Sequence, residues 1–158
     1  MKWLKKRAEL DNMNSMIEFI MEHLNLNVKV TQHIDMEVRL LCEETLMNII
    51  THAYPHEYTD MDMYAGYEYD EECECIILKI CDHGIPFNPL KNEDPIPSGE
   101  ILDREIGGLG IFLIKKISDD IKYERKDGMN ILTMKKYYQP KKSTKEKKKE
   151  SKNGSEKS

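Results

Sequence analysis

Apolar side chains first recur at the three- and four-residue spacing of a helix face near the start of the chain. This stripe is formed by Met13, Met16, Ile17, Ile20 and Leu24. It predicts a helix that Asp11 or Asn12 caps and that ends near Leu24, where Asn25-Leu26-Asn27 interrupts the pattern. Ahead of this helix, Trp3–Lys6 has the length of a short edge strand.

A second stripe predicts the central helix of the chain, from about Asp35 to Ala53, with Thr31 or Asp35 as its start and Pro55 as its stop. The stripe is formed by Val38, Leu41, Cys42, Ile49 and Ala53. Beside it, Glu44 and Asn48 are four residues apart, so their side chains share one face about a turn apart. Such a pair is more often part of a solvated face than of a site, and its meaning depends on the rest of the chain.

The middle and the end of the chain change to the pattern of strands. The expected strands are residues 63–69, 74–82, 120–126 and 130–138. Segment 74–82 is almost continuously apolar, which favours a central place in a sheet, and Asp127-Gly128 predicts a tight hairpin turn. The order of elements predicts an α+β fold: a two-layer α/β sandwich with a mixed, mostly antiparallel sheet and helices on one face.

Two glycine-containing motifs follow these elements. Asp82-His83-Gly84 stands at the end of the central strand, and residues 83–106 then show no convincing periodicity. A loop of that length is uncommon in a compact domain and is usually functional or mobile. Gly107-Gly108-Leu109-Gly110 then opens a helix at residues 111–117. Free amides at a glycine-rich helix start can bind phosphate, although glycine clusters often only make turns.

The charge of the chain is divided unevenly. Residues 139–158 carry eight Lys and three Glu, a local charge of +5, and the body therefore carries −10 within a total of −5. An acidic body is a poor candidate for nucleic-acid binding. The tail has no large apolar side chain and is predicted to be disordered, so we expect one domain at residues 1–138 and a Lys-rich tail at 139–158. A solvated tail is the more frequent case, with RNA or an anionic membrane as alternatives.

Cysteine usage and hydropathy place limits on location. Cys42, Cys73, Cys75 and Cys81 form no Cys-x-x-Cys pair, which favours reduced thiols in the core or in strands over a metal site or a disulfide. No apolar run is long enough to cross a membrane, and the basic first residues lack the apolar segment of a secretory signal. The sequence therefore predicts a cytoplasmic protein without a membrane partner.

Taken together, the three motifs resemble the ATP-binding (Bergerat-type) fold shared by gyrase, histidine kinases and their relatives. The motifs are residues 44–55, Glu-Thr-Leu-Met-Asn-Ile-Ile-Thr-His-Ala-Tyr-Pro; residues 82–89, Asp-His-Gly-Ile-Pro-Phe-Asn-Pro; and residues 108–114, Gly-Leu-Gly-Ile-Phe-Leu-Ile. Within that group the chain is most similar to the small anti-sigma-factor serine/threonine kinases. The likeness spans about residues 6–136.

The resemblance implies an ATP and Mg²⁺ site. Asn48 would coordinate magnesium through its amide oxygen, a hard ligand that suits the ion. Asp82 would accept a hydrogen bond from the adenine amino group, and Gly84 would keep the loop close to the base. Gly108, Leu109 and Gly110 would contribute to phosphate binding.

The same resemblance implies phosphoryl transfer. Glu44 would orient or deprotonate the attacking hydroxyl, and residues 88–106 would form the lid over the nucleotide. Some kinases of this group carry an arginine just before the glycine motif. Here Arg104 lies six residues before Gly110, which puts its contact with the phosphate in doubt.

The implied activity is that of a serine/threonine protein kinase. Its substrate would be a small regulatory protein of the anti-anti-sigma type, its other partner a sigma factor, and a homodimer is compatible with the resemblance. Two alternatives remain: a nucleotide-gated protein-binding module without kinase activity, and an ATPase domain resembling that of histidine kinases. The second is less favoured, because no phosphoacceptor helix pair precedes the domain in this chain.

Overall fold

The computed structural model describes residues 1–27, 30–56, 58–91 and 109–138. Its sheet consists of β1 (Lys2–Arg7), β2 (Asp62–Asp70), β3 (Cys75–Asp82), β4 (Asp120–Lys126) and β5 (Met129–Tyr137), in the order β1-β2-β3-β5-β4. Each described strand pair is antiparallel. The predicted α+β sandwich is thereby confirmed, with the apolar strand β3 in the middle and the expected edge strand at β1.

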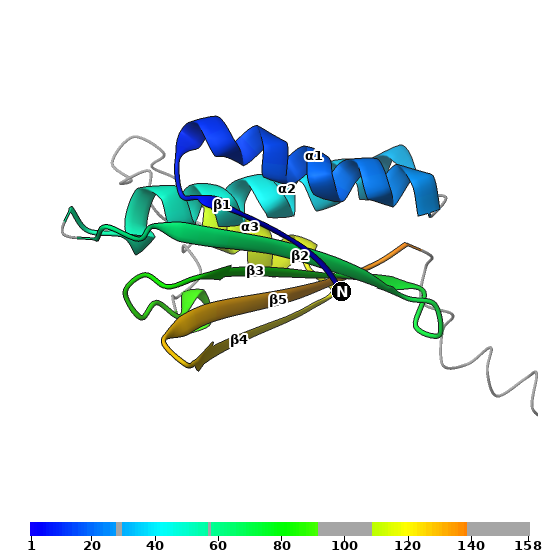
Figure 1. Cartoon of the computed structure of the whole chain (residues 1–158). Coiled ribbons are helices and arrows are strands. Elements are labelled where there is room, and N and C mark those ends of the chain that lie inside the picture. The colour runs from blue at the N-terminus through cyan, green and yellow to red at the C-terminus, as the bar shows by residue number, and fades with distance from the viewer. Residues whose placement is uncertain (28–29, 57, 92–108, 139–158) are drawn as a thin grey trace, which may run out of the picture.

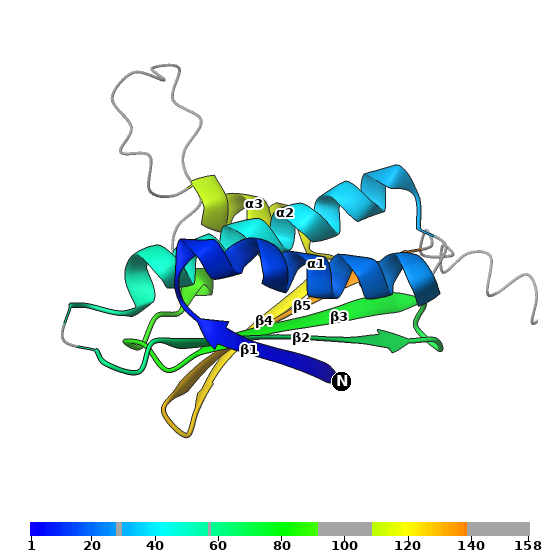
Figure 2. The same cartoon turned by 45° about the horizontal axis from the view of Figure 1, so that its top comes forward.

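Helices cover one face of this sheet. They are α1 (Leu10–Asn27), α2 (Gln32–Asn48) and α3 (Leu109–Ile117), and α2 contacts both α1 and α3 (Figures 1 and 2). Thr31 caps α2, because its side-chain oxygen accepts a hydrogen bond from the Ile34 amide at 3.3 Å. Of the two predicted starts, Thr31 is therefore the one at which the central helix begins.

The ends of α1 differ from the prediction. The helix begins at Leu10, ahead of both predicted caps, and the Asn12 amide donates instead to the Arg7 carbonyl at 3.2 Å. The backbone also stays helical through Asn27, so Asn25-Leu26-Asn27 does not end it. Asn disfavours the helix interior only moderately, and this penalty is too small to end the helix here.

The central helix changes character at its end. Instead of one α-helix to Ala53, the chain forms α2 to Asn48 and then a π-helix, η1 (Ile49–Ala53). Short π-helical turns occur often at functional sites. The wider turn includes the His-Ala part of the first motif, and periodicity at 3.6 residues could not have predicted it.

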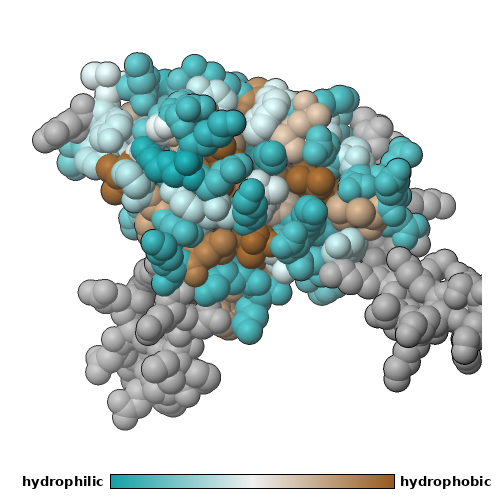
Figure 3. Space-filling view, turned by 90° about the horizontal axis from the view of Figure 1, so that it is seen from below, coloured by the Kyte–Doolittle hydropathy of each residue, from teal (hydrophilic) through white to brown (hydrophobic). Residues whose placement is uncertain are grey.

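The hydrophobic core lies between the helices and the inner face of the sheet. Fully buried members include Met16, Leu41, Leu46, Leu78 and Met134. The opposite face of the sheet bears no helix among the described residues, and Figure 3 shows it as hydrophilic side chains interspersed with small hydrophobic patches. This alternation is typical of an antiparallel sheet with one covered face.

The hairpin turn predicted at Asp127-Gly128 is confirmed. Both residues have positive φ, 51° and 77°, as a two-residue type I′ connection requires. The four cysteines are all free: Cys42, Cys75 and Cys81 are buried, and Cys73 is exposed in the turn between β2 and β3. Reduced thiols in the core or in strands were expected; Cys73 differs only in being exposed.

Candidate functional site

The first two sequence motifs meet at the end of the central helix. The Ala53 carbonyl accepts a hydrogen bond from the Ile85 amide at 2.9 Å. A β-carbon on Gly84 would collide with that same carbonyl, so this position requires glycine for a close backbone approach. The missing side chain of Gly84 therefore lets η1 lie directly against the loop after β3.

Tyr54 strengthens this junction. Its hydroxyl donates to the Asp62 carbonyl and accepts from the His83 amide at 2.9 Å. Burial raises the pKa of the Tyr54 phenol to about 12, so it remains a neutral donor at physiological pH. One side chain of the first motif thus connects the start of β2 to the end of β3, directly beside Asp82.

Asp82 is the buried charge of the site. Its side chain is 6% exposed, and its Oδ1 accepts hydrogen bonds from the Gly84 amide and from Asn130 Nδ2, both at 2.8 Å. The pKa of Asp82 is raised overall, because burial outweighs these two hydrogen bonds and the Arg125 charge, which act to lower it. Oδ2 receives no hydrogen bond from any described residue, which leaves one acceptor available to a ligand.

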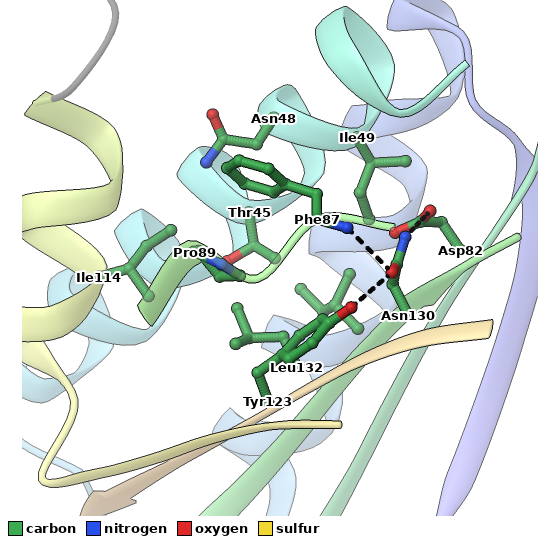
Figure 4. Close-up of a pocket in the computed structure, with 11 residues that line it drawn as sticks. Thr45, Asn48, Ile49, Asp82, Phe87, Pro89, Ile114, Tyr123, Asn130 and Leu132 are labelled. Atoms are coloured by element: carbon green, nitrogen blue, oxygen red, sulfur yellow. Dashed lines mark hydrogen bonds between the residues drawn. The ribbon is translucent and has the colours of Figure 1, made fainter. Parts of the chain in front are cut away.

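Asp82 lies at a pocket between the helix layer and the sheet, shown in Figure 4. About 390 Å³ of space free of protein atoms lies at this pocket, part of it open solvent. Its lining is mostly apolar, with a few polar side chains: Thr45, Asn48, Ile49, Ile80, Asp82, Phe87, Pro89, Ile114, Tyr123, Asn130 and Leu132. Apolar walls with a small number of placed polar groups are typical of a site for a flat organic ligand such as a base.

Asn48 brings the central helix into this pocket. It is the last residue of α2 and is half-buried, and a neighbouring hollow joins it to Asp82 and His52. No group of three His, Cys, Asp or Glu side chains that could hold a metal exists in the described part of the chain. Asn48 carries an amide oxygen, a ligand type that magnesium accepts together with phosphate oxygens and water, and its role as a metal ligand stays a prediction.

Glu44 lies against the start of α3. It is half-buried, and a β-carbon added to Gly110 would collide with Glu44 Oε2. Gly110 therefore lets a carboxylate approach the first turn of a helix, where the helix dipole favours negative charge. Of the predicted site residues, Asn48 and Asp82 thus line one pocket, Gly84 donates its amide to Asp82, and Glu44 and Gly110 lie against each other.

The rest of the predicted phosphate site is only partly described. Leu109 begins α3 and its side chain is 61% exposed, so it contributes little to the core. Gly108, Arg104 and residues 92–106 of the expected lid lie outside the described residues. Their roles stay predictions.

Sequence reasoning missed Asn130, Tyr123 and Arg125. Asn130 is only 6% exposed and points to the covered face of β5, in alternation with Leu132 and Met134. A polar residue at an inward position of a strand is the available indication in the sequence, because a buried amide needs hydrogen-bond partners. Its main partner, Asp82, is 48 residues away, and no local pattern predicts such a pairing.

The comparisons with known proteins agree with this geometry. Residues 7–136 match the family described as Histidine kinase-like ATPase domain. A serine/threonine-protein kinase, BtrW, of Bordetella bronchiseptica is 25% identical over 72% of this chain and 78% of its own. Serine-protein kinase RsbW of Bacillus mycoides is 31% identical over 66% of each chain, and that of Listeria innocua is 27% identical over 63% and 64%.

The alignment with the RsbW proteins therefore spans about two thirds of their length. Among the described residues, no helix is both long and apolar enough to span a membrane.

Proposed function

Because the chain belongs to the family of histidine kinase-like ATPase domains, we propose that it binds ATP with magnesium and phosphorylates a protein on serine or threonine. The observation that carries the proposal is the Asp82 carboxylate, buried at an apolar pocket with Oδ1 already paired and Oδ2 left as an acceptor. An exocyclic amino group, such as that of adenine, supplies the donor this atom lacks.

The proposed nucleotide site uses residues from three elements. Asp82 selects the base, Gly84 admits it close to the backbone, and Asn48 is the protein ligand of the magnesium ion. Gly108, Leu109 and Gly110 present the start of α3 to the phosphates. The ion would neutralise phosphate charge during transfer, and this chain's own residues position the two reacting groups.

Glu44 is the proposed catalytic residue. It is the carboxylate on the same helix face as Asn48, one turn away, and it reaches the start of α3 at Gly110. From there it would accept a proton from the incoming hydroxyl or hold that hydroxyl in line with the phosphate. The names of the relatives in Bordetella and Bacillus, both kinases of serine, support transfer to a hydroxyl.

The proposed partners are a small regulatory protein of the anti-anti-sigma type as substrate and a sigma factor as the protein held and released. A cytoplasmic location and a domain at residues 1–138 with a separate Lys-rich tail at 139–158 belong to the same proposal. A nucleotide-gated binding module remains the second candidate, because it would need the same pocket but no catalytic role for Glu44. The ATPase domain is the third.

Calorimetry with Mg-ATP tests the nucleotide site. Asp82→Asn replaces the free Oδ2 with a group that can donate, and loss of a charge-assisted bond of about 1.5–3 kcal/mol lowers affinity roughly tenfold to a hundredfold. Asp120→Asn, an exposed carboxylate on β4, is the matched control and should leave affinity unchanged. Unchanged affinity in Asp82→Asn would defeat the base-selecting role.

A transfer assay with radiolabelled ATP separates the three activities. Label on a serine or threonine of a candidate partner supports the kinase. ATP and partner binding without label on the partner would favour the binding module, and ATP hydrolysis that no partner alters would favour the ATPase.

A further inference from the structure

Asn130 makes five hydrogen bonds with five partners. Its Nδ2 donates to Asp82 Oδ1 at 2.8 Å and to the Ile85 carbonyl at 2.9 Å. Its Oδ1 accepts from Tyr123, Arg125 and the Phe87 amide. This amide therefore links the end of β3, the loop behind it and strand β4, and it has no capacity left for the ligand.

The orientation of the Asn130 amide is decided from β4. Arg125 Nη1 lies 2.7 Å from Oδ1, and a guanidinium can only donate, so the atom it faces must be the oxygen. The Tyr123 hydroxyl, 2.8 Å from the same oxygen, adds a second donor. A flipped amide would place two donors against each other at Arg125 and two acceptors against each other at Asp82, which is strongly unfavourable.

That orientation determines which oxygen of Asp82 is left free. Because Nδ2 faces Asp82, Oδ1 carries two hydrogen bonds and Oδ2 none from the described residues. We propose that Arg125 and Tyr123 are positioning residues for base selection, which fix the Asn130 amide so that Asp82 Oδ2 remains the acceptor for an exocyclic amino group. The inference rests on the proposed function and identifies the residues that set the base specificity of the nucleotide site.

Arg125 acts on the same loop in two further ways. Its Nη1 also donates to the Gly84 carbonyl at 3.1 Å, which holds the glycine that the base must approach. Its charge lowers the pKa of Asp82 against the larger effect of burial. The other titratable side chains near Asp82 are Cys81, His83, Tyr54 and Tyr123, with His52 across the neighbouring hollow.

The test compares Mg-ATP with Mg-ITP, which carries a carbonyl oxygen where ATP has the amino group. Arg125→Met and Tyr123→Phe should each lower the ratio of ATP to ITP affinity about three- to tenfold, with ITP affinity within about twofold of wild type. Lys122→Met is the matched control: it removes a positive charge from the same strand, where the side chain is exposed beside Glu124, and should leave the ratio unchanged.

A pH series supplies a reading that a purely structural role would not change. ATP preference requires ionised Asp82 and is lost as the pH falls. In Arg125→Met the loss should begin at a higher pH, because the charge that lowers the Asp82 pKa is gone.

The outcomes are separable. A wild-type protein that binds neither nucleotide overturns the proposed function itself. A wild type that prefers ATP, with both variants keeping that ratio and the wild-type pH profile, overturns only the positioning role. A parallel fall in ATP and ITP affinity also overturns it, because the two side chains would then support the pocket without selecting the base.

Discussion

The two ends of strand β5 each bury a polar side chain on the covered face of the sheet. Near its start, Asn130 is 6% exposed and pairs with Asp82; near its end, Lys136 is 8% exposed and pairs with Glu37 at 2.8 Å. Lys136 also donates to the Ile117 carbonyl at 2.9 Å and lies 3.6 Å from Asp119. Both Asn130 and Lys136 are buried, yet only Asn130 lies at the proposed site.

The difference lies in what each buried group faces. Lys136 donates one hydrogen bond to the Ile117 carbonyl and makes ionic contacts with Glu37 and Asp119, so this ionic cluster connects α2, the end of α3 and β5. At Asn130 all five hydrogen bonds are made within the protein, but its partner Asp82 keeps one acceptor at an apolar pocket. A free acceptor at a pocket, more than buried charge itself, indicates a ligand site here.

Glu44→Gln should give the largest effect and should change function alone. If Glu44 acts on the hydroxyl, the variant loses its basic oxygen and transfer falls by about 10²–10⁴, while Mg-ATP affinity and the unfolding free energy stay near wild type. A single-turnover transfer assay with calorimetry on the same preparations measures both. Glu43→Gln, the same change one residue earlier, is the control, and equal transfer rates in all three proteins would remove Glu44 from the mechanism.

Lys136→Met should do the reverse, changing stability and not the site. Removal of Lys136 takes the buried cation away from Glu37 and leaves it only the exposed His33 imidazole at 3.3 Å, so we expect a loss of about 3 kcal/mol in urea unfolding. The neighbouring Lys135 points to the open face near Asp120 at 3.8 Å, so Lys135→Met should cost about 0.5 kcal/mol or less.

Folded Lys136→Met should bind Mg-ATP like wild type. If a fully folded Lys136→Met protein bound Mg-ATP more weakly than wild type, the clusters at Lys136 and Asn130 would be energetically coupled. The distinction between a structural cluster and a ligand site would then fail.

The sequence predicts the elements of the fold but not the polar pairs that distinguish the two ends of β5. Local patterns predicted the helices, the central strand and the Asp127-Gly128 turn, because those depend on neighbours in the chain. The motifs marked Asp82 and Asn48 as candidates. The partners Asn130 and Lys136 were not predicted, since each pairs with a residue far away in the sequence, Asp82 and Glu37. Only the folded sheet brings them together.

Titration of Asp82 should change ATP affinity and folding stability in opposite directions as the pH rises. Burial raises its pKa above the ordinary 3.8, so the folded state binds the proton more tightly than the unfolded state. In the window above pH 3.8, its contribution to stability therefore falls as pH rises through the folded pKa. ATP affinity should rise over the same window, because the ionised form is the acceptor.

Comparing wild type with Asp82→Asn isolates this group, since the variant lacks the titration. Calorimetry and unfolding from about pH 4 upward should show a pH-dependent change in that window for wild type and none for Asp82→Asn, whose ATP affinity stays low throughout. The same pH dependence in both proteins would show that Asp82 does not titrate there.

The smallest effect is expected from removing the Lys-rich tail, which follows the C-terminal end of β5. The Tyr138 amide donates to the Glu74 carbonyl at 3.1 Å, and both residues of this bond remain when residues 141–158 are removed. Deletion of residues 141–158 takes away positive charge from a chain whose body carries −10, but no apolar side chain large enough to pack. Melting temperature and Mg-ATP affinity at physiological salt should therefore match wild type, because screening limits the reach of those charges to roughly 8 Å. A drop in melting temperature would mean that the tail packs on the folded domain. A drop in ATP affinity alone would mean that the tail contacts the nucleotide site.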